Sequence, residues 1–192
     1  MIRVAIVDDH PALRAGLRTI LEAEPGMAFA GESSGEPESL WPLLHRACPD
    51  VVLLDYHLPR GDGLQLCYRI KREVPSPRVI LFSAYAGAAL ALPAALAGAD
   101  GLLPKGVDAR ELFEAVRLAH AGERLIPPVS RTVLAEACAD MEPPDQALVG
   151  MLLDGASEAE AARTLDLDAP AVRRTVQRVL GQLRVEVPAP RA

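Results

Sequence analysis

Residues 51–55 read VVLLD, four consecutive apolar side chains closed by the carboxylate of Asp55. A strand that is apolar at every position is typical of a parallel sheet with helices on both faces. Four further runs have the same character: RVAIV at 3–7, MAFAGE at 27–32, RVILFS at 78–83 and GLLP at 101–104. Between these runs, apolar residues recur at helical spacing, as at Leu13, Leu17 and Ile20. The sequence therefore predicts an α/β fold with a doubly wound, five-stranded parallel sheet.

Polar side chains stand where the apolar runs end. The set consists of Asp8, Asp9, Asp55, Ser83 and Lys105. Ligands of doubly wound folds bind beyond the carboxyl ends of the strands, at one edge of the sheet. We expect these side chains to meet at that edge and to form one site.

Lys105 is one of two lysines among the 20 basic residues of the chain. An ammonium group is a compact point charge that meets a single carboxylate or phosphoryl oxygen, whereas the flat guanidinium of arginine suits bidentate partners. We therefore expect Lys105 to contact an anion at the edge of the sheet. The carboxylates of Asp8, Asp9 and Asp55 are the candidates.

Three carboxylates in one place repel one another, and a cation that neutralises them relieves this repulsion. Ligation by oxygen alone suits Mg²⁺, which keeps several of its waters. The sequence therefore predicts a Mg²⁺ site formed by Asp8, Asp9 and Asp55. The backbone carbonyl of His57 is a further oxygen donor for the ion.

Four segments, in order along the chain, resemble the receiver domain of two-component response regulators. They are VDDHP at 7–11, LLDYHLPRGDG at 53–63, LFSA at 81–84 and PK at 104–105. The resemblance covers about residues 1–120 and implies a flavodoxin-like domain. It further implies that a histidine kinase phosphorylates Asp55, that Asp8 and Asp9 hold Mg²⁺, and that Ser83 and Lys105 contact the phosphoryl group. A carboxylate is a suitable nucleophile for that transfer, with the cations stabilising the phosphoryl oxygens.

Two features depart from the receiver pattern. Leu102 occupies a position in the fifth strand where the family usually carries an aromatic residue that turns inward with the hydroxyl of Ser83. The stretch after Ser83 is rich in alanine and contains Pro93, so we expect a fourth helix that is weakly packed or broken at the proline.

Residues 121–140 predict a linker that carries one short helix, and residues 141–192 predict a small all-α unit of three helices. Ser157 and Asp168 stand at the expected N-caps of the second and third helices.

The segment LLDGASEAEAARTLDLDAPAVRRTVQRVLGQLRV at 152–185 resembles the LuxR-type helix-turn-helix domain. The resemblance places the first helix of the motif at 158–165 and the recognition helix at 169–182. It implies that Arg173, Arg174 and Arg178 contact DNA in the major groove.

Residues 141–192 also depart from the LuxR pattern. They carry eight acidic residues and six arginines, a net charge of −2, which weakens phosphate contacts. The segment VEVPAPRA at 185–192 contains Pro188 and Pro190, which forbid a helix, so we expect an output domain truncated after the recognition helix.

Two functions follow from these patterns. The first is a response regulator that is phosphorylated on Asp55 and regulates transcription through DNA binding. The alternative is a receiver whose degenerate output domain acts through protein contacts and does not bind DNA. An acylphosphate hydrolase would need a catalytic acid near Asp55, and neither Asp62 nor His57 has a diagnostic spacing, so we expect no enzyme.

Composition agrees with an intracellular regulator. The net charge of −6 argues against a protein whose whole surface binds polyanions. No apolar run is long enough for a membrane helix. The three cysteines lack the spacing of disulfide frameworks or zinc sites. We expect a cytoplasmic protein without membrane contact, with a histidine kinase and DNA as partners and homodimer formation on phosphorylation left open.

Overall fold

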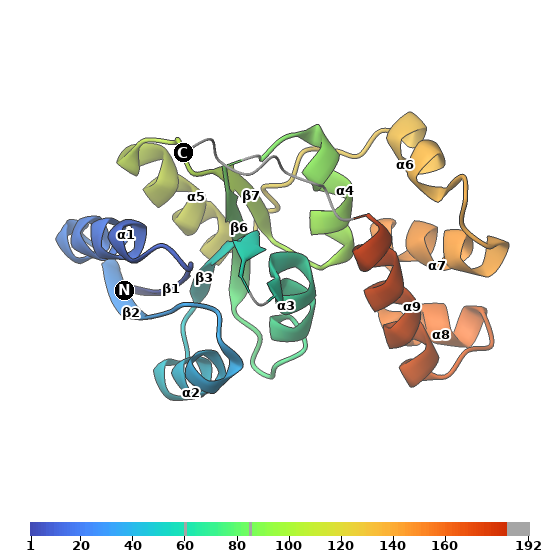
Figure 1. The fold of residues 1–192 in the computed structure, drawn as a ribbon, viewed down its shortest axis with the longest axis horizontal. Coiled ribbons are helices and arrows are strands. Elements are labelled where there is room, and N and C mark those ends of the chain that lie inside the picture. The colour runs from blue at the N-terminus through green and yellow to red at the C-terminus, as the bar shows by residue number, and fades with distance from the viewer. Residues whose placement is uncertain (60, 85, 184–192) are drawn as a thin grey trace.

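The computed structural model describes residues 1–59, 61–84 and 86–183. Five parallel strands form the central sheet (Figure 1) in the order β2-β1-β3-β6-β7. Their bounds are β1 (Ile2–Val7), β2 (Met27–Ser33), β3 (Val51–Asp55), β6 (Arg78–Ser83) and β7 (Gly101–Pro104). The order reverses between β1 and β3, and a reversal of this kind opens a crevice at the carboxyl ends of the two strands. The predicted α/β fold is confirmed.

Helices cover both faces of this sheet. They are α1 (Pro11–Ala23), α2 (Pro37–Ala47), α3 (Gly63–Ile70), α4 (Ala88–Leu96) and α5 (Ala109–Ala121). Helices α1 and α5 pack on one face, while α2, α3 and α4 pack on the other. Every residue of β3 is buried, because side chains on both faces meet a helix layer. A short hairpin of β4 (His57–Leu58) and β5 (Gly61–Asp62) connects β3 to α3.

The expectation of a weakly packed or broken fourth helix is wrong. Helix α4 runs through Pro93 without interruption, and most of its residues are buried, including Leu90, Leu92 and Leu96. A helix that is apolar on all sides is buried on all sides. Here one side of α4 packs on the sheet and another packs on the C-terminal helices.

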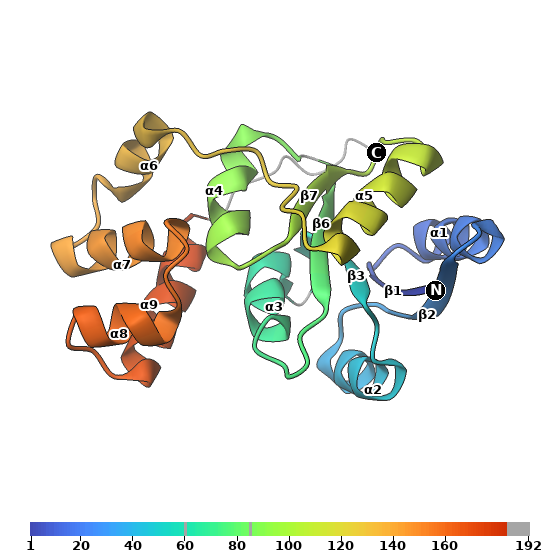
Figure 2. The same ribbon diagram turned by 180° about the vertical axis from the view of Figure 1, so that it is seen from behind.

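Between the sheet domain and residue 183, where the described chain ends, there are four helices at the side of the molecule where α3 and α4 lie (Figures 1 and 2). They are α6 (Arg131–Cys138), α7 (Pro143–Leu153), α8 (Glu158–Thr164) and α9 (Ala169–Gln182). The predicted helix in the linker is α6, and the predicted helix-turn-helix pair is α8 and α9. Ser157 and Asp168 cap these two helices as predicted, accepting bonds from the amides of Glu160 and Ala171.

The C-terminal helices dock on the receiver through α3 and α4, and a continuous cluster of buried apolar side chains spans both parts. Polar contacts border it. The side chain of Gln65 donates to the carbonyl oxygen of Gln177 at 2.7 Å, and the Tyr68 hydroxyl donates to Glu158 at 2.8 Å. Arg72 forms an ion pair with the same Glu158 carboxylate. We call these residues, Gln65, Tyr68 and Arg72 with Glu158 and Gln177, the docking contact.

Within the described part of the chain, every helix is too short or too polar to cross a bilayer. The predicted end of the output domain, including Pro188 and Pro190, lies outside the described residues, as does Arg184 in the segment that resembles the LuxR motif.

Candidate functional site

The carboxyl edge of the sheet brings together the side chains that the sequence singled out. Asp8 follows β1, Asp55 closes β3, and Lys105 follows β7. The Nζ atom of Lys105 lies 2.7 Å from Oδ2 of Asp8 and 2.8 Å from Oδ2 of Asp55. The anions that Lys105 meets are therefore Asp8 and Asp55, and the more exposed Asp9 turns to His10. Asp8 and Asp55 are 2% and 3% exposed, so the contact is shielded from water.

Ser83 and His57 lie at the same edge. Ser83 is 1% exposed at the end of β6, and its carbonyl oxygen accepts the backbone N–H of Lys105 at 2.9 Å. This bond ties the ends of β6 and β7 together beside Asp55. The backbone N–H of His57 donates to Oδ1 of Asp55 at 3.2 Å, while the imidazole of His57 is exposed.

The charges at this edge do not balance. Burial raises the pKa of Asp55, the ammonium of Lys105 opposes the rise, and the charge of Asp8 adds to it. Burial also works against the charge on Lys105, but hydrogen bonds and charges from Asp55 and Asp8 outweigh it and raise the Lys105 pKa. Asp8, Asp9 and Asp55 carry three negative charges against the one positive charge of Lys105, a difference of two. A bound divalent cation would cancel that difference.

The donor set fits such an ion. Ligand atoms of Asp8, Asp9, His10 and Asp55 all lie within 4.8 Å of one another. The described residues hold one such group of three or more potential ligands, and it is at the edge where the sequence predicted Mg²⁺. Carboxylate oxygens are the protein ligands that Mg²⁺ prefers.

Comparisons with known proteins agree with this geometry. Residues 4–117 match the family model of the response regulator receiver domain. The DNA-binding transcriptional activator DevR/DosR of Mycobacterium tuberculosis is 31% identical over 196 residues, which cover 97% of this chain and 90% of that protein. The chain belongs to the two-component response regulators.

Solved structures extend the similarity to the C-terminal helices. A LuxR-family response regulator from Aurantimonas sp. SI85-9A1 is 33% identical with a TM-score of 0.60, over 72% of this chain and 98% of that one. ChrA, a response regulator of a heme-sensing two-component system, is 28% identical with a TM-score of 0.53, over 97% of this chain and 92% of that one. The named relatives are regulators rather than enzymes. The family predicted from the sequence is confirmed.

Gly63 is a residue of this response regulator whose role the sequence did not reveal. A Cβ atom at Gly63 would lie 2.3 Å from the carbonyl oxygen of Asp55 and 2.7 Å from Cα of Tyr56. Glycine thus lets α3 begin directly against the backbone that carries Asp55. The signal was present in the quoted segment LLDYHLPRGDG, whose last residue is Gly63.

Arg14 was also missed. Its guanidinium donates to the carbonyl oxygen of Asp8 at 2.7 Å and to the carboxylate of Glu32 at 3.3 Å. Arg14 lies on α1 and Glu32 on β2, so this contact fixes the chain at the end of β1 from two sides. A single arginine on an amphipathic helix carries no pattern that would have identified it.

The predicted DNA contacts lie apart from the acidic edge. Arg173, Arg174 and Arg178 are exposed on α9. Arg178 forms an ion pair at 2.5 Å with Asp145, which lies in the first turn of α7. The positive charge of α9 is thus partly compensated within the C-terminal helices.

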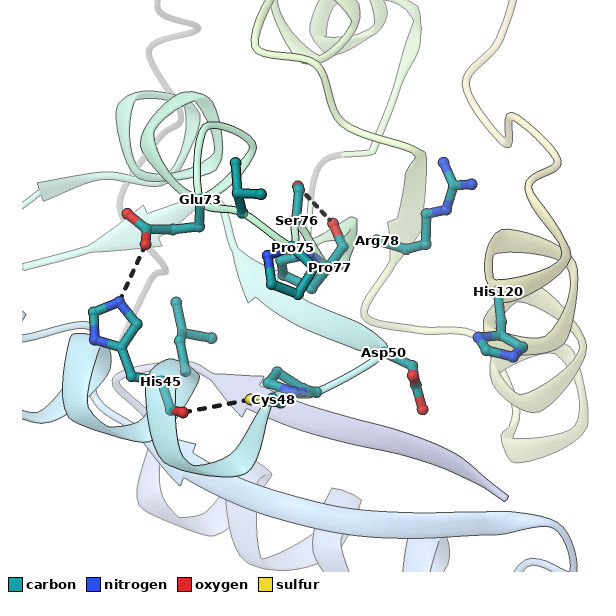
Figure 3. Close-up of a pocket in the computed structure, with 12 residues that line it drawn as sticks. His45, Cys48, Asp50, Glu73, Pro75, Ser76, Pro77, Arg78 and His120 are labelled. Atoms are coloured by element: carbon teal, nitrogen blue, oxygen red, sulfur yellow. Dashed lines mark hydrogen bonds and ion pairs between the residues drawn. The ribbon is translucent and has the colours of Figure 1, made fainter.

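A separate pocket of about 420 Å³ lies at the opposite end of the sheet, before the first residues of β3 and β6 (Figure 3). His45 on α2 and Glu73 after α3 form a hydrogen bond of 3.1 Å across one side of it. Cys48 lies beside them, and its thiol donates to the carbonyl oxygen of His45. None of the predicted site residues lines this pocket.

Proposed function

We propose that Asp55 accepts a phosphoryl group from a histidine kinase and that this modification controls DNA binding by the C-terminal helices. The receiver would occupy residues 1–120, the linker 121–140 and the output domain 141–192. The observation that carries the proposal is the contact of Lys105 with both Asp8 and Asp55 at the carboxyl edge of the sheet. We also propose a cytoplasmic location, because the DNA that α9 would contact lies there.

In the proposed transfer, a carboxylate oxygen of Asp55 attacks phosphorus. A phosphorus–oxygen bond forms, the bond from phosphorus to the kinase histidine breaks, and the histidine nitrogen leaves with the electron pair. Lys105 would turn its ammonium from Asp55 to a phosphoryl oxygen, and the Ser83 hydroxyl would hydrogen-bond another. Mg²⁺, held by Asp8, Asp9, Asp55 and the carbonyl of His57, would neutralise charge on the phosphoryl oxygens.

Labelling by acetyl phosphate tests this proposal. The wild-type chain should gain one phosphoryl group by intact mass, sensitive to hydroxylamine, and EDTA should prevent the gain. Asp55→Asn should abolish it. Asp62→Asn is the matched control in the same loop, because asparagine keeps the oxygen that accepts the Leu64 amide at 2.8 Å. Full labelling of Asp55→Asn would show that Asp55 is not the acceptor. Labelling that proceeds unchanged in EDTA would show that the transfer needs no divalent metal ion.

For the output domain, we propose that α9 enters the major groove and that Arg173, Arg174 and Arg178 contact DNA. A relative that matches 97% of the chain carries the name of a DNA-binding transcriptional activator, which supports transcriptional regulation here. The alternative, an output domain that acts only through protein contacts, is not favoured. Arginine suits this role because its planar fork bonds guanine or phosphate in two places.

The docking contact links the two proposed activities. Helix α3 begins at Gly63 against Asp55 and carries Gln65 and Tyr68 to the C-terminal helices, and Arg72 follows two residues after its end. A change at Asp55 therefore has a short path to α9. We propose that phosphorylation loosens the docking contact, frees α9 for DNA, and leaves the released receiver able to form a homodimer.

A further inference from the structure

An imidazole joins the three carboxylates at the acidic edge. Nδ1 of His10 lies 2.6 Å from Oδ1 of Asp9 and 3.2 Å from Oδ1 of Asp8. The ring therefore sits among the same oxygen atoms that would hold the cation. A group of three carboxylates alone would favour Mg²⁺. A nitrogen donor beside them shifts the preference of the site toward transition-metal ions.

The backbone directs His10 to this place. Its N–H donates to Oδ1 of Asp8 at 2.8 Å, and it is the N-cap residue of α1, with Pro11 opening the helix. The side chain of His10 is 63% exposed, so it contributes little to the core. The contacts that the His10 side chain makes in this conformation are those with Asp8 and Asp9.

We infer that His10 is a metal ligand and that the pocket binds a divalent transition ion of the Co²⁺ or Zn²⁺ kind more tightly than Mg²⁺. The inference rests on the proposed function, because the ion would occupy the same place beside Asp55. Imidazole suits late first-row ions, and the affinity of mixed nitrogen and oxygen sites rises along that row. Phosphorylation of Asp55 then runs at a much lower concentration of such an ion than of Mg²⁺.

The test is a titration of the full chain with Co²⁺ and with Mg²⁺. Calorimetry measures the affinity for each ion, and visible absorption monitors the bound Co²⁺. The absorption depends on ligand type and coordination geometry, and so reports a nitrogen ligand directly. Wild type is compared with His10→Ala. His45→Ala is the matched control, since His45 is 62% exposed and pairs with Glu73 at 3.1 Å at the other end of the sheet (Figure 3).

His10→Ala should weaken Co²⁺ binding by at least about tenfold and change the Co²⁺ absorption. Its affinity for Mg²⁺ should stay within about twofold of wild type, because Mg²⁺ uses the oxygen ligands. His45→Ala should behave as wild type with both ions.

Equal Co²⁺ affinity and an unchanged absorption spectrum in wild type and His10→Ala would overturn the inference. An effect of His45→Ala as large as that of His10→Ala would also overturn it, because the ion would then bind elsewhere. Failure of the proposed function is a different result: the wild type would show no labelling of Asp55 with Mg²⁺ while Co²⁺ still bound through His10.

Discussion

The acidic edge of the sheet and helix α9, the proposed recognition helix, carry the two halves of the proposed function, and they are built in opposite ways. Asp8 and Asp55 are buried at strand ends, where the backbone holds each carboxylate against Lys105. The arginines of α9 are exposed, and Arg178 is paired with an acid of its own unit. The first site is defined by the fold of one domain. The second site lies on helices that pack against α3 and α4, so a change at the first site reaches it through that packing, which includes the docking contact.

The largest effect is expected at the buried site. Lys105→Ala should slow phosphorylation of Asp55 by about a hundredfold, because it removes a preorganised positive charge from a shielded place. The initial rate of labelling by acetyl phosphate measures this. Lys71→Ala removes the other lysine, which pairs with Asp100 at 2.8 Å, and should leave the rate unchanged. A wild-type rate for Lys105→Ala would show that the contact with Asp55 plays no part in transfer.

Single changes at the exposed site should have effects that lie mostly below that hundredfold. Arg174→Ala should weaken DNA binding by about 1 to 3 kcal/mol if Arg174 reads a base edge. A phosphate contact would instead reduce the slope of log affinity against log salt by about 0.9. Anisotropy of labelled duplex DNA at several salt concentrations separates the two. Arg131→Ala on α6 removes the same charge outside α9, and an equal loss in that variant would place the DNA surface elsewhere.

The docking contact allows a test of how the two sites are joined. Arg72→Ala removes the ion pair with Glu158 and should raise the DNA affinity of the unphosphorylated chain by up to about fivefold, since partly exposed pairs contribute up to about 1 kcal/mol. DNA affinity without acetyl phosphate is the measurement. Arg69→Ala, three residues earlier in the last turn of α3, removes an arginine that stacks on Trp41 and should have no such effect. A lower affinity in Arg72→Ala would contradict the proposed release.

The smallest effect concerns stability. Burial raises the pKa of Asp55, so the folded chain holds this proton more tightly than the unfolded chain. The group therefore stabilises the fold fully below its ordinary pKa of 3.8, and the contribution is lost as the pH rises through the raised value. Asp55→Asn should thus raise Tm at pH 7 in EDTA, with a gain that shrinks toward pH 3.8. A gain in Tm that grows as the pH falls would show that folding lowers the pKa of Asp55 instead of raising it.

The same difference between the two regions explains what could be predicted from the sequence. Strand positions and the convergence of Asp8, Asp55 and Lys105 follow from apolar runs that end in polar residues, because parallel strands finish at one edge. The caps Ser157 and Asp168 are local signals and were also found.

Features that depend on tertiary packing were not predictable in this way. Helix α4 was expected to be weakly packed or broken because its sequence is rich in alanine and contains Pro93, yet it is continuous and buried because the sheet and the C-terminal helices cover it. Tyr68 and Glu158 are 90 residues apart, and no local pattern joins them. Arg14 acts on the backbone of Asp8, a contact that only the folded chain creates.

The most direct test of the account measures how tightly the full chain binds a fluorescently labelled random DNA duplex. Fluorescence anisotropy gives the affinity at two salt concentrations, with and without beryllofluoride and Mg²⁺. Beryllofluoride would mimic the phosphoryl group that we propose on Asp55. The account predicts salt-dependent binding that tightens with beryllofluoride in the wild type and does not tighten in Asp55→Asn. Absence of binding up to about 100 µM, where non-specific association with DNA is normally seen, would contradict it. So would binding that is equally tight with and without beryllofluoride.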